Sequence, residues 1–290
     1  MEKDVKQAEN QEEMNEILLD TQVNEKIENS PYLQMQEERK NLLYSPKQAK
    51  IIAVWGDNGI TSLSFAIASA LESIHNKQIV VISMDKLVPT NTMVHIFKQA
   101  PKEKSLAHLL NLSKINSTTV AQYLIADEKK NPNIATLAYC EGDNVLTEEK
   151  ASYETYIQIL KNLQTISDYI VVDCSKEVSN LMTLAALQLA EVQVVALTPD
   201  PKGLSFYKTN AGLLSAPQFN NAKRIFVANN ESPYNDAGSF KDALKFPVVT
   251  SLPEDTGIRR ACADGDMLNS CAYFSRKYKK NMQKLLKELL

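Results

Sequence analysis

The chain has 290 residues, 44% of them hydrophobic, and a formal net charge of −3 at neutral pH. This length and composition predict one large α/β domain plus an extra segment, and the net charge argues against a protein that coats nucleic acid over its whole surface. No apolar run approaches the roughly 20 residues of a membrane span, and we expect no secretory signal. The four cysteines lack CxxC spacing, which predicts reduced, buried thiols in a cytoplasmic protein.

Residues 1–46 are predicted to form an acidic, polar N-terminal extension that is flexible or partly helical. Within residues 1–45, eleven acidic and five basic side chains give a local charge of −6, which leaves +3 for the rest of the chain. Glycine is absent from this stretch, and only short apolar pairs interrupt it. The composition is typical of a disordered leader or of an arm that binds a partner.

Residues 47–290 are predicted to form a single domain, because short apolar runs alternate there with amphipathic stretches. Strands are predicted at 51–55, 79–83, 134–139, 169–173, 192–197, 224–228 and 248–250. Helices are predicted at 61–75, 90–99, 105–112, 118–126, 152–166, 180–190, 202–214, 236–244, 255–264 and 272–290. Near-continuous Val and Ile runs indicate strands buried on both faces. We therefore predict a doubly wound, mostly parallel sheet with helices on both faces, and a ligand at the carboxyl ends of the strands.

A glycine-containing turn follows the first predicted strand and precedes the first helix. It reads Gly56, Asp57, Asn58, Gly59, Ile60, Thr61 and Ser62. This is the layout of a phosphate-binding P-loop, in which backbone N–H groups and a helix N-terminus surround the phosphates. Thr61 stands where a hydroxyl would reach Mg²⁺, but Ile60 stands where the chemistry requires lysine. The sequence predicts a phosphate cradle without its main cation.

Polar side chains end several later strands. Asp85 follows the strand at 79–83, and Asp173 ends the strand at 169–173. Carboxylates at strand ends beside a P-loop are the usual ligands of Mg²⁺ or of its waters. Farther along, Asn229 ends a strand, and Pro253, Glu254 and Asp255 lead from the last strand into a helix.

Together these motifs resemble the MinD/ParA class of P-loop ATPases, whose loop is a deviant Walker A motif, over about residues 48–290. The resemblance implies a P-loop fold, ATP or ADP with Mg²⁺ as ligands, and a homodimer. For the metal, it implies that Thr61, Asp85 and Asp173 hold Mg²⁺ and that Asp85 also positions the attacking water. For the base, it implies that Asn229 contacts adenine and that Pro253, Glu254 and Asp255 form the loop beside it. The phosphates would be bound by Gly56, Asp57, Asn58, Gly59, Ile60, Thr61 and Ser62.

Three residues of the loop region depart from the family pattern. Ile60 replaces the Walker lysine, and Trp55 replaces the lysine that reaches across the dimer to the partner's phosphates. Asp57 replaces a glycine and is expected to bring negative charge towards the phosphates. We predict that Trp55 makes an apolar dimer contact in place of the lost salt contact.

The missing lysines remove two charge-assisted contacts, each worth on the order of 1.5–3 kcal/mol. They also remove charge stabilisation in the phosphoryl-transfer transition state, which argues against fast hydrolysis and leaves ATPase activity weak or absent. Binding through backbone N–H groups, Thr61 and Mg²⁺ stays open. Lys202, Lys208 and Arg259 are candidate substitute cations, although nothing in the sequence aims them at the loop.

The stretch 274–290 is predicted to be a basic amphipathic helix. Its apolar stripe consists of Phe274, Tyr278, Met282, Leu285 and Leu289, and six basic residues occupy the other faces against one acidic residue. Such a helix can lie on an anionic membrane surface, or it can pack its stripe on the sheet. The sequence leaves both alternatives open.

Three functional hypotheses follow. The lysine-free loop is similar to the TadZ/CpaE-like branch, whose members localise pilus, secretion or conjugation machinery, although the receiver-like N-terminal domain of many members is missing. The first hypothesis is therefore a dimerising pseudo-ATPase scaffold, cytoplasmic, at a cell pole or at the inner face of the membrane. The second is an active ATPase for DNA partitioning or division-site positioning. Its DNA-binding version is disfavoured, because the basic residues outside the last helix are scattered. The third is a protein-interaction module that has lost its nucleotide.

Overall fold

The computed structural model describes residues 48–85, 101–127, 131–144, 146–147, 151–219, 222–235 and 237–290. All of these residues belong to the second of two units of the chain, Lys47–Leu290. The extension predicted for residues 1–46 and the helix predicted for residues 90–99 lie outside the described residues.

An eight-stranded sheet runs through the described part of the chain, in the order β3-β4-β2-β5-β1-β6-β7-β8. The strands are β1 (Lys50–Gly56), β2 (Ile79–Ser83), β3 (Ile125–Asp127), β4 (Asn131–Leu137), β5 (Tyr169–Asp173), β6 (Val192–Leu197), β7 (Lys223–Glu231) and β8 (Val248–Pro253). Neighbouring strands pair in parallel, except that β3 runs antiparallel to β4 at one edge. The mostly parallel sheet and its central β1 confirm the predicted fold class.

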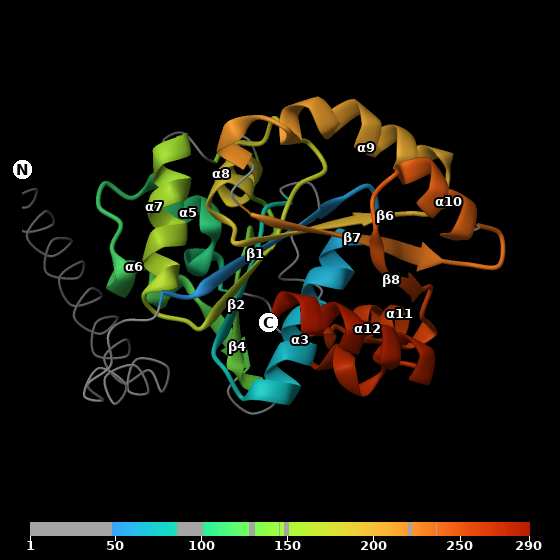
Figure 1. Ribbon diagram of the computed structural model, residues 1–290. Coiled ribbons are helices and arrows are strands. Elements are labelled where there is room, and N and C mark those ends of the chain that lie inside the picture. The colour runs from blue at the N-terminus through green and yellow to red at the C-terminus, as the bar shows by residue number, and fades with distance from the viewer. Residues whose placement is uncertain are drawn as a thin grey trace, which may run out of the picture. The chain divides into compact units, whose positions relative to one another are not determined.

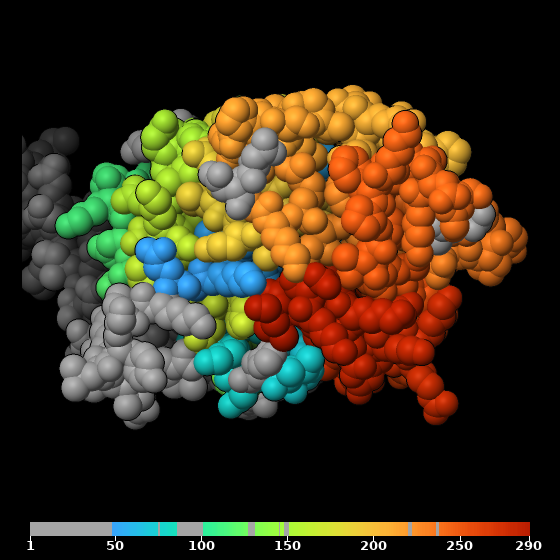
Figure 2. Space-filling model, in the orientation of Figure 1, coloured from blue at the N-terminus to red at the C-terminus, as the bar shows by residue number. Residues whose placement is uncertain are grey.

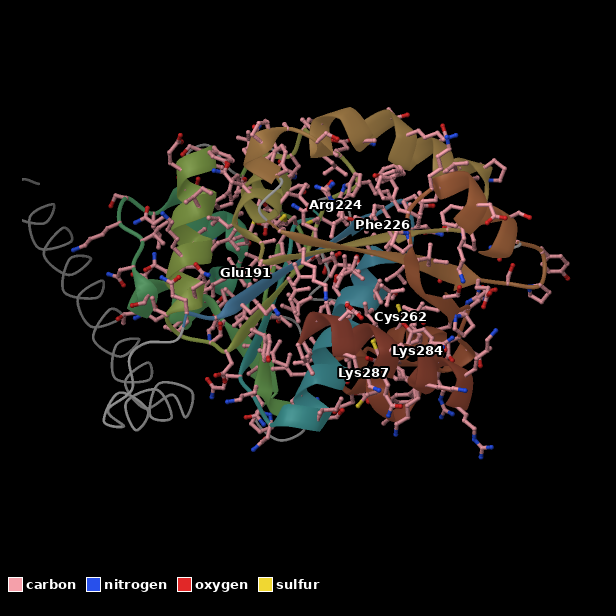
Figure 3. The ribbon with its side chains drawn as sticks, in the orientation of Figure 1. Glu191, Arg224, Phe226, Cys262, Lys284 and Lys287 are labelled. Atoms are coloured by element: carbon pink, nitrogen blue, oxygen red, sulfur yellow. The ribbon has the colours of Figure 1, made fainter. Side chains whose placement is uncertain are left out.

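Helices cover both faces of this sheet (Figure 1). They are α3 (Ile60–His75), α5 (Leu106–Asn111), α6 (Ser117–Tyr123), α7 (Tyr153–Gln164), α8 (Leu181–Leu189), α9 (Pro201–Leu214), α10 (Ala237–Leu244), α11 (Thr256–Ala263) and α12 (Arg276–Leu289), with short 3-10 turns at Lys102–Lys104, Pro217–Phe219 and Met267–Ala272. In Figure 1, α3, α11 and α12 lie on one side of the sheet, and α7, α8 and α9 lie on the other. Arg224 and Phe226 of β7 lie beneath α9 (Figure 3). The sheet therefore lies between two layers of helices.

The C-terminal helix α12 packs on the sheet. Tyr278, Met282, Leu285 and Leu289 are buried in the same apolar cluster as α3, and Lys50 Nζ donates to the Leu289 carbonyl at 2.6 Å. On the face shown in Figure 2, this red segment forms one block beside α3. Of the two alternatives, the structure favours packing over a membrane contact, because the apolar stripe is already covered.

The basic side chains of α12 are exposed to solvent, on the face opposite the stripe. They are Arg276, Lys277, Lys279, Lys280, Lys284 and Lys287, of which Lys284 and Lys287 are labelled in Figure 3. No helix in the described ranges has the length and hydropathy needed to cross a membrane.

Among the described residues, two predicted helices differ from the structure by three or more residues at one end. The helix predicted at 118–126 ends at Tyr123, because Leu124 adopts an extended conformation and residues 125–127 become the edge strand β3. The last helix begins at Arg276 and not at residue 272. Ser275 is its N-cap and accepts a hydrogen bond from the Tyr278 N–H, which fixes the start of the helix.

Candidate functional site

The turn between β1 and α3 requires glycine at both of its ends. A Cβ on Gly56 would lie 1.7 Å from the Ala196 carbonyl oxygen, which is too close for any other residue. Gly59 has a left-handed φ of 69° and precedes α3 without a side-chain cap. A turn of this kind leaves the first N–H groups of the helix available to bind an anion.

Hydrogen bonds to the ends of the neighbouring strands hold this turn in place. Asp57 Oδ1 accepts a 2.7 Å hydrogen bond from the Thr198 N–H, just after β6. Asn229 Nδ2, from β7, donates to the Asn58 carbonyl at 3.0 Å. The expectation that Asp57 directs its charge towards a phosphate is wrong, because its carboxylate is bound to the backbone of the next strand. Asn229, predicted to contact a base, is 4% exposed and fixes the turn.

Ile60 occupies the position at which a P-loop has its lysine, and its side chain points into the protein. It is 5% exposed and belongs to the apolar cluster formed with α3 and α12. Only the backbone of this residue is therefore available to a ligand in the turn. The structure supplies no positive charge at this position.

Trp55 lies inside the sheet and has no exposed surface. Its ring packs against Phe206 of α9, with the two ring centroids 4.8 Å apart. The prediction that Trp55 makes a dimer contact is wrong, because β1 is a central strand and both of its faces are covered by helices. An indole in that position stabilises the packing of α9 on the sheet.

The three residues predicted to hold Mg²⁺ come together at the carboxyl ends of the strands. Thr61 and Ser83 donate hydrogen bonds to the carboxylate of Asp173, from Ser83 Oγ at 2.7 Å, and the charge of Asp85 acts on the same group. Burial raises the pKa of Asp173 to about 7, an effect that the two hydrogen bonds oppose and the nearby negative charge of Asp85 reinforces. This carboxylate is therefore poorly stabilised without a cation.

This donor set fits Mg²⁺. Within the described ranges, no three His, Cys, Asp or Glu side chains converge as a metal-binding group, so two carboxylates and a hydroxyl are what the site offers. Mg²⁺ commonly uses one or two carboxylates and keeps several waters. Thr61, Asp85 and Asp173 match that pattern better than a site enclosed by protein ligands alone.

A cavity of about 400 Å³ opens beside the turn. It is lined by Asn58, Gly59, Ser62, Leu63, Asn229, Asn230, Ser232, Pro253, Glu254, Asp255, Ile258, Arg259, Cys262 and Tyr278. Cys262, labelled in Figure 3, lines it from α11. Its volume falls in the range of small-molecule sites. Seven of the predicted binding residues share this cavity, whereas Gly56, Asp57, Ile60 and Thr61 do not line it.

Asp255 has a structural task within this cavity. Its Oδ1 accepts from the N–H groups of Gly257 at 2.8 Å and Ile258 at 3.2 Å, which caps α11. Its Oδ2 accepts from the Ser275 N–H at 3.2 Å, just before α12. The carboxylate therefore joins the last two helices, and its direct role towards a ligand stays a prediction.

Two features of the site do not follow from the sequence pattern. Arg259 lines the cavity and forms an ion pair with Glu254, whereas the other candidate cations, Lys202 and Lys208, do not line it. Ser83, the partner of Asp173, was not identified. Its place at the end of β2, two residues before Asp85, is the signal that was available.

Comparison with known proteins gives one family and a set of structural neighbours. The AAA domain family matches residues 49–209, more than half of the chain. MinD from Pyrococcus horikoshii, solved with Mg-ADP, is 18% identical with a TM-score of 0.66, covering 83% of this chain and 96% of that one. A ParA family ATPase from Chlorobium tepidum is 13% identical with a TM-score of 0.67, covering 82% and 98%.

The MinC:MinD complex from Aquifex aeolicus is a third neighbour, 15% identical with a TM-score of 0.65, covering 83% of this chain and 96% of that one. No curated protein sequence matches the chain. Identities at this level establish a shared fold and leave the chemistry of each site to its own residues.

Proposed function

This chain belongs to the AAA domain family and has the MinD/ParA type of P-loop fold, and from that premise we propose that it is a nucleotide-binding scaffold. It binds ATP or ADP with Mg²⁺, dimerises, and positions another assembly with little or no ATP hydrolysis. Support for the nucleotide comes from the MinD structure solved with Mg-ADP. Support for a protein partner comes from the MinC:MinD complex.

The observation that carries this proposal is the contrast between the backbone and the side chains of the turn. Gly56 and Gly59 allow a turn that fits a phosphate. Ile60, which stands at the position of the P-loop lysine, is buried. Backbone N–H groups suffice to bind phosphate. Hydrolysis also requires charge stabilisation in the transition state, where loss of one such contact commonly costs about a hundredfold or more in rate.

The proposed ligand interactions use residues on both sides of the turn. The N–H groups at the start of α3 would bind phosphate, and Thr61 and Asp173 would hold Mg²⁺ with Asp85 nearby. Bound Mg²⁺ would neutralise part of the phosphate charge. Asn229 and the segment from Pro253 to Asp255 would border the base. The raised pKa of Asp173 supports a cation in this place.

We further propose that the assembly positioned is pilus, secretion or conjugation machinery, as in the TadZ/CpaE-like branch that the lysine-free loop resembles. On this hypothesis the protein is cytoplasmic, at a cell pole or at the inner membrane face. The partner-binding segment would be the acidic extension, residues 1–46.

Calorimetric titration of the full chain with ATP and ADP in the presence of Mg²⁺, with light scattering on the same samples, tests the proposal. We expect binding of both nucleotides, a shift towards dimer with ATP, and phosphate release close to background. The absence of binding would overturn the nucleotide part and favour the interaction module. Turnover clearly above background that Asp85→Ala abolishes would favour the active ATPase.

A further inference from the structure

Arg259 is a positively charged side chain that lines the cavity beside the turn. It lies on α11 and lines the cavity together with Asn58, Gly59 and Ser62. Of the described residues that line this cavity, it is the one Lys or Arg. Its side chain is 71% exposed, so it can change direction without disturbing the core.

Glu254 holds the Arg259 guanidinium in an ion pair at the edge of the cavity. The Glu254 backbone is fixed, because its N–H donates to the Glu231 carbonyl at 2.8 Å. The side chains of this pair are both well exposed, and exposed ion pairs are weak. A ligand with a stronger negative charge can therefore displace the carboxylate from the guanidinium.

Among the residues that line the cavity, Arg259 is the one basic side chain that could pair with a polyphosphate. Ile60 is buried in the core, and the carboxylates of Glu254 and Asp255 line the cavity. The neighbouring basic residue Lys277 bonds Glu231 at 3.1 Å and does not line the cavity. A guanidinium binds phosphate through charge-assisted, often bidentate hydrogen bonds.

We propose that Arg259 is the cation that replaces the missing loop lysine, and that it exchanges its bond to Glu254 for a phosphate group of the bound nucleotide. Glu254 thereby acts as a competitor that holds the arginine when no nucleotide is bound. This inference rests on the proposed function, because it requires that a nucleotide enters the cavity. It assigns the phosphate contact to α11, a helix remote in sequence from the turn.

Arg260 provides a matched control. It is the next residue on the same helix, it is similarly exposed, and it pairs with Asp264 at 3.5 Å without lining the cavity. Calorimetry on the full chain with Mg²⁺ would compare wild type, Arg259→Gln, Arg260→Gln and Arg259→Lys, each titrated with ATP and with adenosine. Thermal unfolding of each variant would confirm that the fold is retained.

We expect Arg259→Gln to weaken ATP binding by roughly ten- to a hundredfold and to leave adenosine binding unchanged. Arg260→Gln should bind ATP like wild type, and Arg259→Lys should recover part of the loss. Glu254→Gln should strengthen ATP binding, because the competitor for the arginine is gone.

If the wild-type chain binds nucleotide, three results would overturn the inference. ATP binding by Arg259→Gln equal to that of wild type would exclude the contact. An equal loss for ATP and adenosine would place the arginine on the base or ribose. Weaker ATP binding by Glu254→Gln would exclude the competition. If the wild-type chain binds no nucleotide at all, the proposed function fails first and the inference fails with it.

Discussion

The two sides of the β1–α3 turn differ in whether they present side chains that could bind a ligand or a cation. On the loop side, Ile60 is buried and Asp57 is bound to the next strand, so no charged side chain of these positions is directed at a ligand. On the strand-end side, Thr61 and Ser83 still surround the buried carboxylate of Asp173. The shape of the turn depends on its glycines and on packing, whereas its charge depends on side chains that can be replaced without changing that shape.

The shape of the turn depends most strongly on Gly56. Gly56→Ala places a methyl group 1.7 Å from the Ala196 carbonyl, so β1 and β6 must separate. We expect a loss of more than about 4 kcal/mol in the free energy of unfolding, or no folded protein. Urea denaturation measures it. Gly212→Ala is the control, because nothing lies within 4 Å of its added Cβ in α9 and alanine favours a helix by about 1 kcal/mol.

Trp55→Ala tests whether this residue is a core residue or a dimer contact. Removal of the buried indole from Phe206 leaves a cavity under α9, which should cost about 3–5 kcal/mol in the free energy of unfolding. The dimerisation constant of the folded fraction should stay unchanged, as sedimentation would show. A weaker dimer with unaltered stability would contradict the burial seen here.

Asp173→Asn tests how the buried carboxylate on the strand-end side affects stability. The pKa of Asp173 is raised to about 7 in the folded chain. Its contribution to the free energy of unfolding is therefore fully present below the pKa that it has in the unfolded chain, and is lost as the pH rises through about 7. Without Mg²⁺, the variant should be more stable than wild type at pH 8.5, by about 1–4 kcal/mol, and this advantage should be clearly smaller at pH 5 and vanish only below about pH 4. Thermal unfolding at the two pH values measures the difference, and a pH-independent difference would contradict it.

Ile60→Lys asks whether the turn can regain the charge it lost. The lysine stem would replace Ile60 in the core, and its ammonium would reach the turn. We therefore expect roughly tenfold tighter ATP binding and a modest loss in the free energy of unfolding. Ile60→Met is the matched control, since it fills the same apolar space without charge. Calorimetry distinguishes the two. If both variants bind ATP equally, charge at this position has no effect.

The parts of the fold that follow from local pattern were predictable. Runs of Val and Ile gave the parallel strands, and their shared carboxyl edge explains why Thr61, Asp85 and Asp173 could be expected to meet. The edge strand β3 was missed because its three residues continue the pattern of a preceding helix. Strand existence depends here on pairing with β4, which local propensity does not encode.

Side-chain direction was the part of the site that sequence could not determine. Trp55 and Asp57 lie next to the turn in the chain, but the position of α9 and of the Thr198 N–H decides where they point. Arg259 shows the converse, because nothing near it in sequence relates it to residues 56–62. Its place in the cavity depends on how α11 packs after β8.

Tyr278 of α12 both lines the cavity and belongs to the core around α3. During synthesis, α3 emerges from the ribosome long before α12, so the apolar side of α3 is covered by α12 only at the end of synthesis. The cavity wall closes only after that helix has docked. A chain that has not yet added α12 therefore lacks one wall of this cavity.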